Sequence, residues 1–359
     1  MTPVRRIGLV THGGRAAARE VAERVRAWAG RRDIAVVDVE VWTDPGLGPE
    51  AQPSAAADTG DRDGPNALDL VVTVGGDGTF LRGVRVAARH DAPVLGVDLG
   101  RVGFLTEVRP DEVEQALDAC LDGTAPVERR LTLRMRASRP LTIPPEIEGL
   151  LRYGRGPAPS PQPPRSGDPD DVGYGVALDE VAVNDVVFEK LARDRQASLG
   201  VYLDAKLFAS YSADALIVAS STGSTAYSFA AGGPVVSPRL DAMVFTPVAP
   251  HMVFDRSLLL AADETVGVRV LERSGRVAVS VHGQLRGVLD PGDWVAVYAG
   301  DTRARLVRLH PTDFYGRLRA RFGLADAAAA AADGSPPAEY RPPDDVPMPD
   351  DIVRLFRSV

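Results

Sequence analysis

The stretch LDLVVTVGGDGT, residues 68–79, decides the fold of the N-terminal half. It begins as a largely apolar run of strand length, and a helical pattern follows over about residues 79–88. A glycine-rich loop at the end of a parallel strand lets backbone N–H groups approach phosphate oxygens, and the helix N-terminus adds partial positive charge. We therefore expect a phosphate-binding loop formed by Gly75, Gly76, Gly78 and Thr79.

An aspartate, Asp77, stands inside this loop. Phosphates repel a carboxylate, so Asp77 indicates either a metal ligand or a general base that takes a proton from an attacking hydroxyl. The alternative is a plain strand-to-helix turn in which Asp77 caps the helix. The pattern alone leaves both interpretations open, because glycine-rich turns of this kind are common.

Strands and helices alternate around the loop. Apolar runs predict strands over 7–10, 34–41 and 93–99, and helical periodicity predicts helices over 15–29 and 110–121. Such alternation is typical of a parallel sheet with crossover helices. We therefore expect an α/β, Rossmann-like domain over residues 1–127.

The texture of the sequence changes after residue 128. Short apolar or alternating runs follow one another with few helical stretches, which predicts an all-β sandwich over 128–305. A Pro-, Gly- and Ser-rich insert, 140–172, interrupts this domain, and the tail, 324–359, is rich in Ala, Asp and Pro. We expect both segments to be disordered, because few apolar side chains are available to offset the entropy of ordering.

Composition excludes several classes of partner. The 359 residues carry 41 Lys plus Arg against 49 Asp plus Glu, a net charge of −8, so a broad nucleic-acid-binding surface is not expected. Cys120 is the only cysteine of the sequence, which excludes an intramolecular disulfide and indicates a cytoplasmic protein. No apolar stretch is long enough to cross a membrane, and no membrane partner is expected.

A second segment, SSTGSTAYS at residues 220–228, is followed by AGGP at 231–234. Small and hydroxyl-bearing residues offer an approachable backbone and several hydrogen-bond donors, and Tyr227 offers an aromatic face on which a base can stack. A nucleotide pocket would use all three properties. The alternative is a Ser/Thr-rich turn with Tyr227 in the core.

Together the two segments resemble the NAD kinase (ATP-NAD kinase) family. That family carries Gly-Gly-Asp-Gly in its first domain, and Thr-Pro-Thr-Gly-Ser-Thr-Ala-Tyr-Ser followed by Ala-Gly-Gly-Pro in its second. Phosphofructokinases and some lipid kinases share a related first motif, so the second motif makes the resemblance specific. The resemblance spans about residues 4–323, and its further matching stretches are Gly100–Leu105, Asn184-Asp185, Thr246–His251 and Phe314–Phe322.

The resemblance implies an enzyme that transfers the γ-phosphate of ATP, with Mg²⁺, to the 2′-hydroxyl of the adenosine ribose of NAD. Asp77 would be the general base, and the loop glycines would cradle the phosphates of ATP. The chain would return to the N-terminal domain over 306–323, and the protein would be a homo-oligomer, a dimer or a tetramer. No metal ligand is assigned. The implied contacts to the dinucleotide are Asn184, Asp185, Asp214, Thr225, Ala226, Tyr227 and Ser228.

Four departures from the family pattern fall inside motifs. Asp98 and His282 replace an Asn and an Asp of the family, and we add them and His251 to the candidate site residues. Ser220-Ser221 replaces Thr-Pro. Ala213 and Ala215 replace the glycines around Asp214, and their methyl groups are expected to crowd the nicotinamide half of the pocket.

Because of these departures, two alternative functions stay open. The first is a kinase of the same fold that acts on a hydroxyl of another nucleotide or nucleoside. The second is a non-catalytic nucleotide-binding regulator, although the intact Asp77 argues against loss of catalysis.

Overall fold

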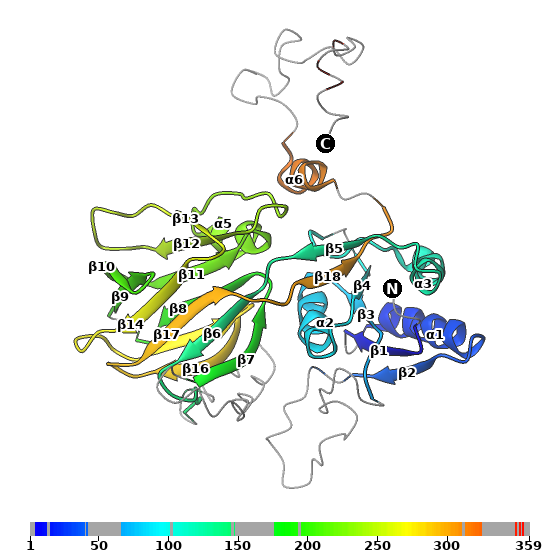
Figure 1. Cartoon of the computed structure of the whole chain (residues 1–359), viewed down its shortest axis with the longest axis horizontal. Coiled ribbons are helices and arrows are strands. Elements are labelled where there is room, and N and C mark those ends of the chain that lie inside the picture. Colours follow the sequence, from blue (N-terminus) through cyan, green and yellow to red (C-terminus); the bar gives the residue numbers. More distant parts are fainter. Residues whose placement is uncertain are drawn as a thin grey trace. The chain divides into compact units, whose positions relative to one another are not determined.

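A computed structural model gives the structure of the chain (Figure 1). The chain divides into two units, residues 1–312 and 313–359, which are described separately below. The structure describes residues 4–12, 15–39, 41, 66–100, 103–144, 147, 176–192, 195–310, 313–324, 349, 352 and 354.

The first sheet of the larger unit has six strands in the order β2-β1-β3-β4-β18-β5. All residues of β3 and β4 are buried, as in the centre of a sheet that helices cover on both faces. The strands run parallel except for β5, which pairs antiparallel with β18, so the expected parallel sheet is mixed at one edge. The strands are β1 (Arg6–Thr11), β2 (Ala35–Asp38), β3 (Leu70–Gly75), β4 (Val94–Asp98), β5 (Val127–Arg130) and β18 (Ala304–Val307).

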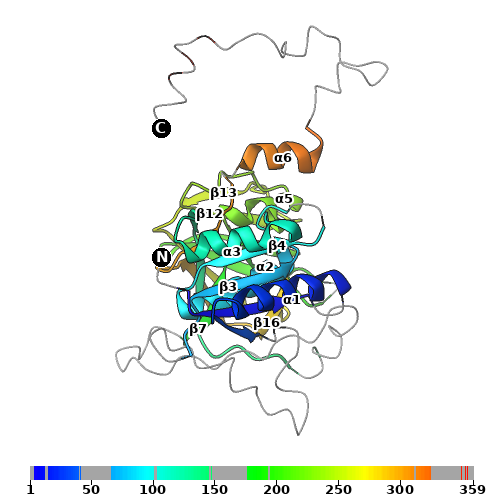
Figure 2. The same cartoon turned by 90° about the vertical axis from the view of Figure 1, so that its right-hand side faces the viewer.

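Helices cover both faces of this sheet (Figure 2). Helix α1 (Ala16–Gly30) and helix α3 (Val113–Leu121), which the 3₁₀ turn η1 (Pro110–Glu112) precedes, pack on one face through residues at helical spacing. Helix α2 (Asp77–His90) packs on the other face through Phe80, Val84 and Ala87. Cys120 is part of the α3 core, where burial raises the pKa of its thiol to about 12.

The rest of the larger unit consists mainly of two antiparallel six-stranded sheets, in the orders β10-β9-β14-β17-β6-β7 and β13-β12-β11-β8-β15-β16. Their inner faces enclose one large apolar core. The first sheet contains β6 (Leu133–Ala137), β7 (Val176–Ala182), β9 (Ala197–Leu203), β10 (Lys206–Ala213), β14 (Thr265–Val270) and β17 (Trp294–Ala299). The second contains β8 (Asp185–Lys190), β11 (Ala215–Ser220), β12 (Ala242–Val248), β13 (Leu258–Ala261), β15 (Val277–Val281) and β16 (Gln284–Leu289).

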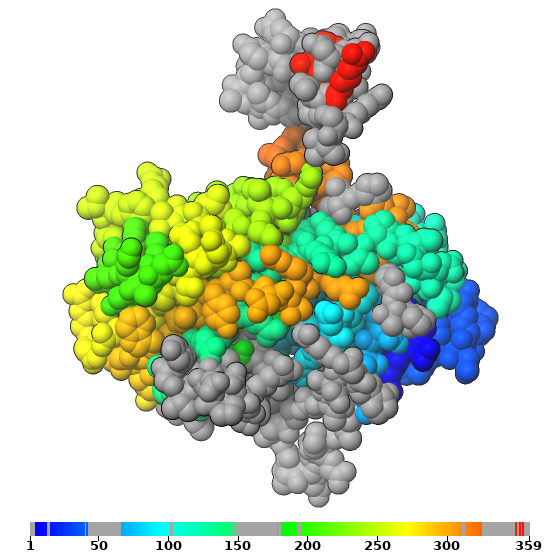
Figure 3. All heavy atoms as spheres, in the orientation of Figure 1, coloured from blue at the N-terminus to red at the C-terminus, as the bar shows by residue number. Residues whose placement is uncertain are grey.

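The chain crosses between the α/β and the all-β parts at β5 and β18, which lie side by side (Figure 3). Both crossings fall near the expected domain limits, which stay predictions. Of the expected insert, Leu141 is buried and Thr142 pairs with Val288, so the ordered fold extends past residue 140. Of the insert, residues 140–144 and Ile147 are described, and the rest lies outside the described residues.

The smaller unit contains helix α6 (Phe314–Phe322). The Asp313 side chain accepts a hydrogen bond from the backbone N–H of Gly316, and Gly323 ends the helix with a positive φ of 61°. Most of the expected disordered tail lies outside the described residues. Among the helices that the structure describes, none is long and apolar enough to span a membrane.

Candidate active site

The predicted phosphate loop joins β3 to α2. Gly75 ends the strand, Gly76 precedes the helix, and Asp77 is the first helical residue. A Cβ atom at Gly76 or Gly78 would have no described neighbour within 4 Å, so the backbone at both positions is open to a ligand. By contrast, a Cβ atom at Gly75 would lie 2.3 Å from the hydroxyl of the buried Thr79. The structure thus places Gly76 and Gly78 where phosphate can approach, with Gly75 and Thr79 packed behind them.

The carboxylate of Asp77 faces the loop that follows β4. Its Oδ2 accepts a hydrogen bond from the backbone N–H of Phe104 (3.1 Å), and its Oδ1 accepts from those of Leu105 (3.1 Å) and Thr106 (3.3 Å). This approach requires glycine at position 103, because a Cβ atom there would lie 2.2 Å from Asp77 Oδ1. Asp77 is therefore fixed in orientation by the backbone of this loop.

Asp98 lies beside Asp77 and supports the same loop. It is buried at the end of β4 and accepts hydrogen bonds from the backbone N–H groups of Gly100 (2.7 Å) and Gly103 (3.0 Å). The hydroxyl of Thr106 is 2.8 Å from Asp98 Oδ2 and 3.3 Å from Asp77 Oδ1. A hydroxyl has one hydrogen to donate, and the shorter distance assigns it to Asp98. Asp98 thus orients the loop that orients Asp77.

The second predicted segment folds as the 3₁₀ turn η3 (Thr222–Thr225) and the one-turn helix α5 (Tyr227–Ala230). It lies against Asn184, because a Cβ atom at Gly223 would be 2.0 Å from the Asn184 carbonyl oxygen. Ser220 links the two: its hydroxyl donates to the carbonyl of Val183 and accepts from the N–H of Gly223 (3.2 Å). Asn184 and the Ser/Thr-rich segment therefore form one substructure.

Ser220 and Ser221, which stand where the family has Thr-Pro, both make hydrogen bonds within the fold. Ser220 supplies the hydroxyl described above. Ser221 has a φ of −55°, a value that proline also adopts, and its N–H donates to the carbonyl of Ala242 (3.1 Å), which proline could not do. The substitution thus replaces a rigid residue by a hydrogen bond.

Two predicted ligand contacts in this segment have hydroxyls that form hydrogen bonds within the protein. Ser228 is fully buried, and its Oγ lies 2.9 Å from the Thr246 hydroxyl. The hydroxyl of Thr225 is 3.4 Å from the carbonyl oxygen of Thr222, to which it donates. Any contact of Ser228 with a dinucleotide would therefore use its backbone. Tyr227 behaves differently: 42% of its surface is exposed, so its ring is available for stacking.

Carboxylates surround Tyr227. Asp185, the first residue of β8, is buried, and burial raises its pKa to about 6. Burial, together with the nearby charges of Glu189, Asp185 and Asp214, raises the pKa of the Tyr227 phenol. We did not predict Glu189 from the sequence. The sequence could have indicated it, because Glu189 lies four residues after Asp185 on the same strand and therefore on the same face.

Asp214 joins β10 to β11, and one of its carboxylate oxygens is 2.6 Å from Lys190 Nζ. The methyl group of Ala213 lies in the large core between the sheets, and that of Ala215 packs in a smaller cluster with Val187. The expected crowding of a ligand by Ala213 is therefore wrong. His251 is exposed near Asp214, and its backbone N–H donates to the carbonyl of Ser212 (2.7 Å).

His282 and Gly283 form the two-residue turn between β15 and β16, with positive φ angles of 51° and 70°. The imidazole Nε2 accepts hydrogen bonds from the backbone N–H groups of Val183 (2.8 Å) and Asn184 (3.1 Å). Desolvation, assisted by the charges of Arg85 and Arg286, lowers the pKa of His282 to about 3. His282 is therefore a neutral acceptor that holds the backbone of Asn184 in place.

The α/β and all-β parts meet between the loop that contacts Asp77 and the substructure around Asn184. Val183, next to Asn184, belongs to the same apolar cluster as Phe80 and Leu105. Phe80 lies three residues after Asp77 on α2, and the N–H of Leu105 donates to the Asp77 carboxylate. Arg85 of α2 donates to the side chain of Gln284, two residues beyond His282 (3.3 Å). The phosphate loop and the Ser/Thr-rich segment thus lie on either side of one junction.

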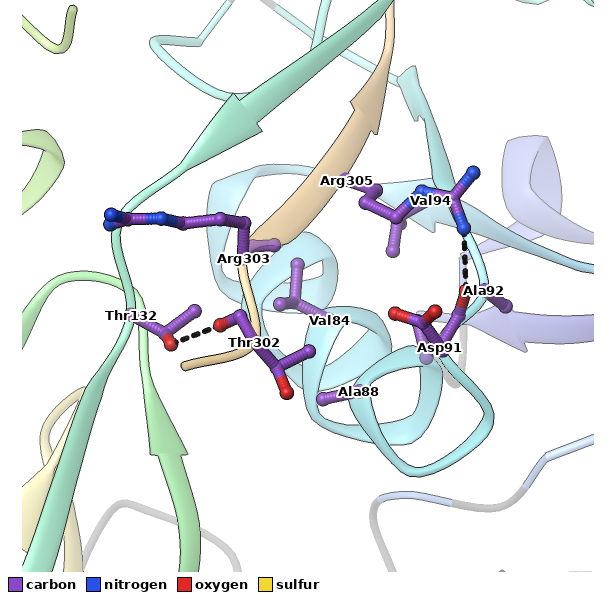
Figure 4. A pocket seen from close by; sticks show the side chains of 11 residues that line it. Val84, Ala88, Asp91, Ala92, Val94, Thr132, Thr302, Arg303 and Arg305 are labelled. Atoms are coloured by element: carbon purple, nitrogen blue, oxygen red, sulfur yellow. Dashed lines mark hydrogen bonds between the residues drawn. The ribbon is translucent and has the colours of Figure 1, made fainter. Parts of the chain in front are cut away.

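A pocket elsewhere contains none of the predicted site residues (Figure 4). Its walls come from the last turns of α2, the start of β4 and the start of β18, and they include Ala88, Asp91 and Arg305. Ala88 lies eleven residues after Asp77, which in a helix corresponds to about 16 Å. We therefore separate this pocket from the candidate active site. In the part of the chain that the structure describes, no group of three or more His, Cys, Asp or Glu residues could hold a metal ion.

A carboxylate in a glycine-rich strand-to-helix loop, with a Ser/Thr-rich segment across the junction from it, is the arrangement expected of a nucleotide-dependent phosphotransferase. Family models agree: residues 7–125 match the ATP-NAD kinase N-terminal domain, and residues 183–309 match the ATP-NAD kinase C-terminal domain. The chain belongs to the NAD kinase family. The predicted family and the predicted two-part fold are confirmed.

Individual relatives agree with the family models. The chain is 58% identical to NAD kinase 1 of Streptomyces coelicolor, over 99% of this chain and 95% of that one. It is 35% identical to the NAD kinase of Moorella thermoacetica over 79% of each. Yeast NADH kinase complexed with NADH has the same fold, with a TM-score of 0.67 at 20% identity, covering 91% of this chain and 90% of that one. An Archaeoglobus fulgidus NAD kinase in complex with ATP gives 0.57 at 22% identity, covering 89% and 97%.

Proposed function

We propose that this enzyme transfers the γ-phosphate of ATP to the 2′-hydroxyl of the adenosine ribose of NAD, producing NADP and ADP. The observation that carries the proposal is the Asp77 carboxylate at the first turn of α2, oriented by the N–H groups of Phe104 and Leu105 beside an open glycine backbone. Its relatives at 56–58% identity, which are named NAD kinases, support NAD as the acceptor.

In this mechanism Asp77 accepts the proton of the 2′-hydroxyl as the ribose oxygen attacks the γ-phosphorus. The bond between that phosphorus and the β,γ-bridging oxygen breaks, and ADP leaves. Backbone N–H groups around Gly76 and Gly78 and the N-terminus of α2 stabilise the phosphate charge. Asn184, Asp185, Asp214 and the exposed ring of Tyr227, with the Thr225–Ser228 backbone, would hold the dinucleotide.

Mg²⁺ is proposed to enter bound to the phosphates of ATP. The described residues offer no cluster of three potential ligands, and Asp77 and Asp98 already accept several backbone hydrogen bonds each. The donor set therefore does not fit a protein-built metal site, and no step is derived through one. Phosphate oxygens are ordinary ligands of Mg²⁺, which usually retains several waters as well.

We also propose a cytoplasmic homo-oligomer. Large apolar side chains are exposed at the end of the all-β part, where the rings of Phe208 and Phe254 are in contact at 5.7 Å and Leu207 and Val253 adjoin them. Exposed apolar side chains that gather in this way support self-association. The single cysteine of the sequence, Cys120, supports a reducing compartment.

Incubation of the protein with ATP, Mg²⁺ and NAD tests the proposed function. We expect NADP as the product, with phosphorus NMR placing the new phosphate on the 2′-oxygen. NADH, ADP-ribose, AMP and adenosine serve as competing acceptors. Transfer to one of the smaller acceptors with none to NAD would contradict the proposal and favour the related kinase described above.

A further inference from the structure

A group of four charged residues, of which Glu107, Arg130 and Arg308 are buried and Glu128 is partly buried, connects the loop that orients Asp77 to the Ser/Thr-rich segment. We call Glu107, Glu128, Arg130 and Arg308 the junction network. Glu128 and Arg130 lie on β5, and Arg308 follows β18, so the network sits where the chain crosses between its two parts. Figure 3 shows these two segments, teal and orange, next to each other in the middle of the molecule.

At one end the network contacts the loop beside Asp77. Arg308 Nη1 donates to the carbonyl of Leu105 (2.7 Å), the residue whose N–H donates to Asp77. Glu107 lies 3.5 Å from Arg308 and accepts hydrogen bonds from the backbone N–H groups of Leu309 (2.7 Å) and His310 (3.3 Å). The loop therefore has the Asp77 carboxylate on one side and Arg308 on the other.

At the other end the network contacts the first residue of η3. Glu128 accepts from Arg308 Nε (2.8 Å) and from Arg130 Nη2 (2.7 Å), and Arg130 Nη1 donates to the hydroxyl of Thr222 (3.2 Å). Burial would raise the pKa of Glu128, but the charges and hydrogen bonds of Arg130 and Arg308 hold it below its usual value. Glu128 is therefore ionised, and the path from Leu105 to Thr222 is continuous.

Buried ion pairs are weak contributors to stability, because removing charges from water offsets most of their attraction. Their directional hydrogen bonds do restrict geometry, and Arg130 and Arg308 are both buried. Phosphoryl transfer depends on placing an acceptor hydroxyl in line with a phosphate and within reach of a base. In this protein the base and the dinucleotide segment come from different parts of the chain.

We infer that the junction network is a positioning device for catalysis: it holds the loop behind Asp77 and the Thr222–Thr225 turn at the spacing that phosphoryl transfer requires. Arg130 is its key residue, because its guanidinium contacts Glu128 and Thr222 at the same time. The inference rests on the proposed function, since it concerns transfer between ligands on the two sides of the junction.

The test uses the full chain, four single variants and the Arg130→Lys/Thr222→Val double variant. Arg130→Lys keeps the charge but has one nitrogen in place of a fork, and Thr222→Val removes only the hydroxyl acceptor. Thr222→Ser retains that acceptor. Arg305→Lys is the matched control: this arginine lies on β18, the strand that pairs with β5, but donates to the carbonyl of Asp91 (2.8 Å), outside the path. For each protein we would measure kcat, the separate Kd values for NAD and ATP by calorimetry, and Tm.

We expect kcat to fall about tenfold or more in Arg130→Lys and Thr222→Val, while each Kd stays within about threefold of the wild-type value. Thr222→Ser should recover most of kcat, and the double variant should lose less than the two single effects combined. An unchanged kcat in Thr222→Val, or a Kd for NAD that rises as much as kcat/KM falls, would overturn the inference. No NADP from the wild-type chain would overturn the proposed function instead, and this inference with it.

Discussion

Asp185 is enclosed at the start of β8, and burial raises its pKa to about 6 despite hydrogen bonds from the backbone of Tyr227 and His282. An ionised carboxylate is a stronger acceptor for ribose hydroxyls than the neutral acid. We therefore expect the affinity for NAD to weaken as the pH falls through about 6. The folding stability of the unliganded enzyme changes in the opposite direction. Because the pKa of Asp185 lies above the ordinary 3.8, its protonation between about pH 6 and pH 3.8 adds stability to the folded chain.

Calorimetric titration of NAD at a series of pH values between about 5 and 8 measures the effect. Asp185→Asn is the control, because its side chain cannot titrate. We expect weaker but pH-independent binding in this variant. If Asp185→Asn kept the wild-type pH dependence, Asp185 would not be the titrating group.

His282 is a candidate site residue in the sequence, but in the structure its side chain holds the backbone of Val183 and Asn184. Its Nε2 accepts from two partly buried N–H groups, so His282→Leu should lower the free energy of unfolding by up to about 1–3 kcal/mol for each donor left without an acceptor. His282→Asp should retain most of that stability, since a carboxylate can accept both bonds and Asp-Gly suits the turn. Urea unfolding at neutral pH provides the measurement.

The pH dependence gives a second check on His282. Its folded-state pKa of about 3 lies below the ordinary 6.5, so the unfolded chain takes up the proton first. The stability that neutral His282 contributes is therefore complete above about pH 6.5 and is lost as the pH falls toward 3. Equal stability of His282→Leu and the wild type would contradict the assigned role.

Individual site residues differed in how well the sequence predicted them. Asp77 and its glycines stood out because a carboxylate inside a phosphate loop has few explanations. Asp98 was noticed only as a departure from the family. Gly103 and Thr106 were missed as contacts of Asp77, because their role depends on backbone hydrogen bonds between positions 26 to 29 residues apart along the chain. Ser228 was predicted from its motif, and only packing shows that its hydroxyl faces Thr246.

Turn η3 depends on one glycine. Gly223→Ala would place a methyl group 2.0 Å from the Asn184 carbonyl, a backbone atom that cannot move without disturbing β8. We expect this variant to bind NAD at least about tenfold more weakly and to retain ATP binding, because the phosphate loop lies in the other part of the chain. Gly275→Ala is a matched control, since a Cβ atom there would meet no described atom within 4 Å. Similar NAD affinity in both variants would contradict this role for Gly223.

Among the elements, those with a clear apolar pattern of their own were predicted, and strands β5 and β18 were not. Helix α1 and strand β3 carry strong apolar patterns over 15 and 6 residues. Strands β5 and β18 have four residues each, and they pair with one another across some 170 residues of intervening chain. Such a pairing leaves no local pattern, because it depends on where the rest of the fold brings the two ends. The antiparallel edge of the first sheet was therefore missed.

For the whole molecule, the glycine-rich loop and the later Ser/Thr-rich segment predicted that ATP phosphates bind to the α/β part and the dinucleotide to the all-β part. How those parts join could not be predicted. Contacts of Val183 with the Phe80 and Leu105 cluster, together with the junction network, determine it. These contacts link residues far apart in sequence, and buried Arg and Glu residues give the same local pattern as solvent-exposed ones.

The role of Asp77 as general base is the assignment on which the rest of the account depends. Asp77→Asn keeps the size of the side chain and one acceptor oxygen for the loop N–H groups, but it removes the basic carboxylate. Steady-state kinetics with NAD and ATP, combined with calorimetric Kd values for each nucleotide, should show kcat lower by about 10² to 10⁴ with both Kd values retained. A variant that turns over NAD at nearly the wild-type rate would contradict the account.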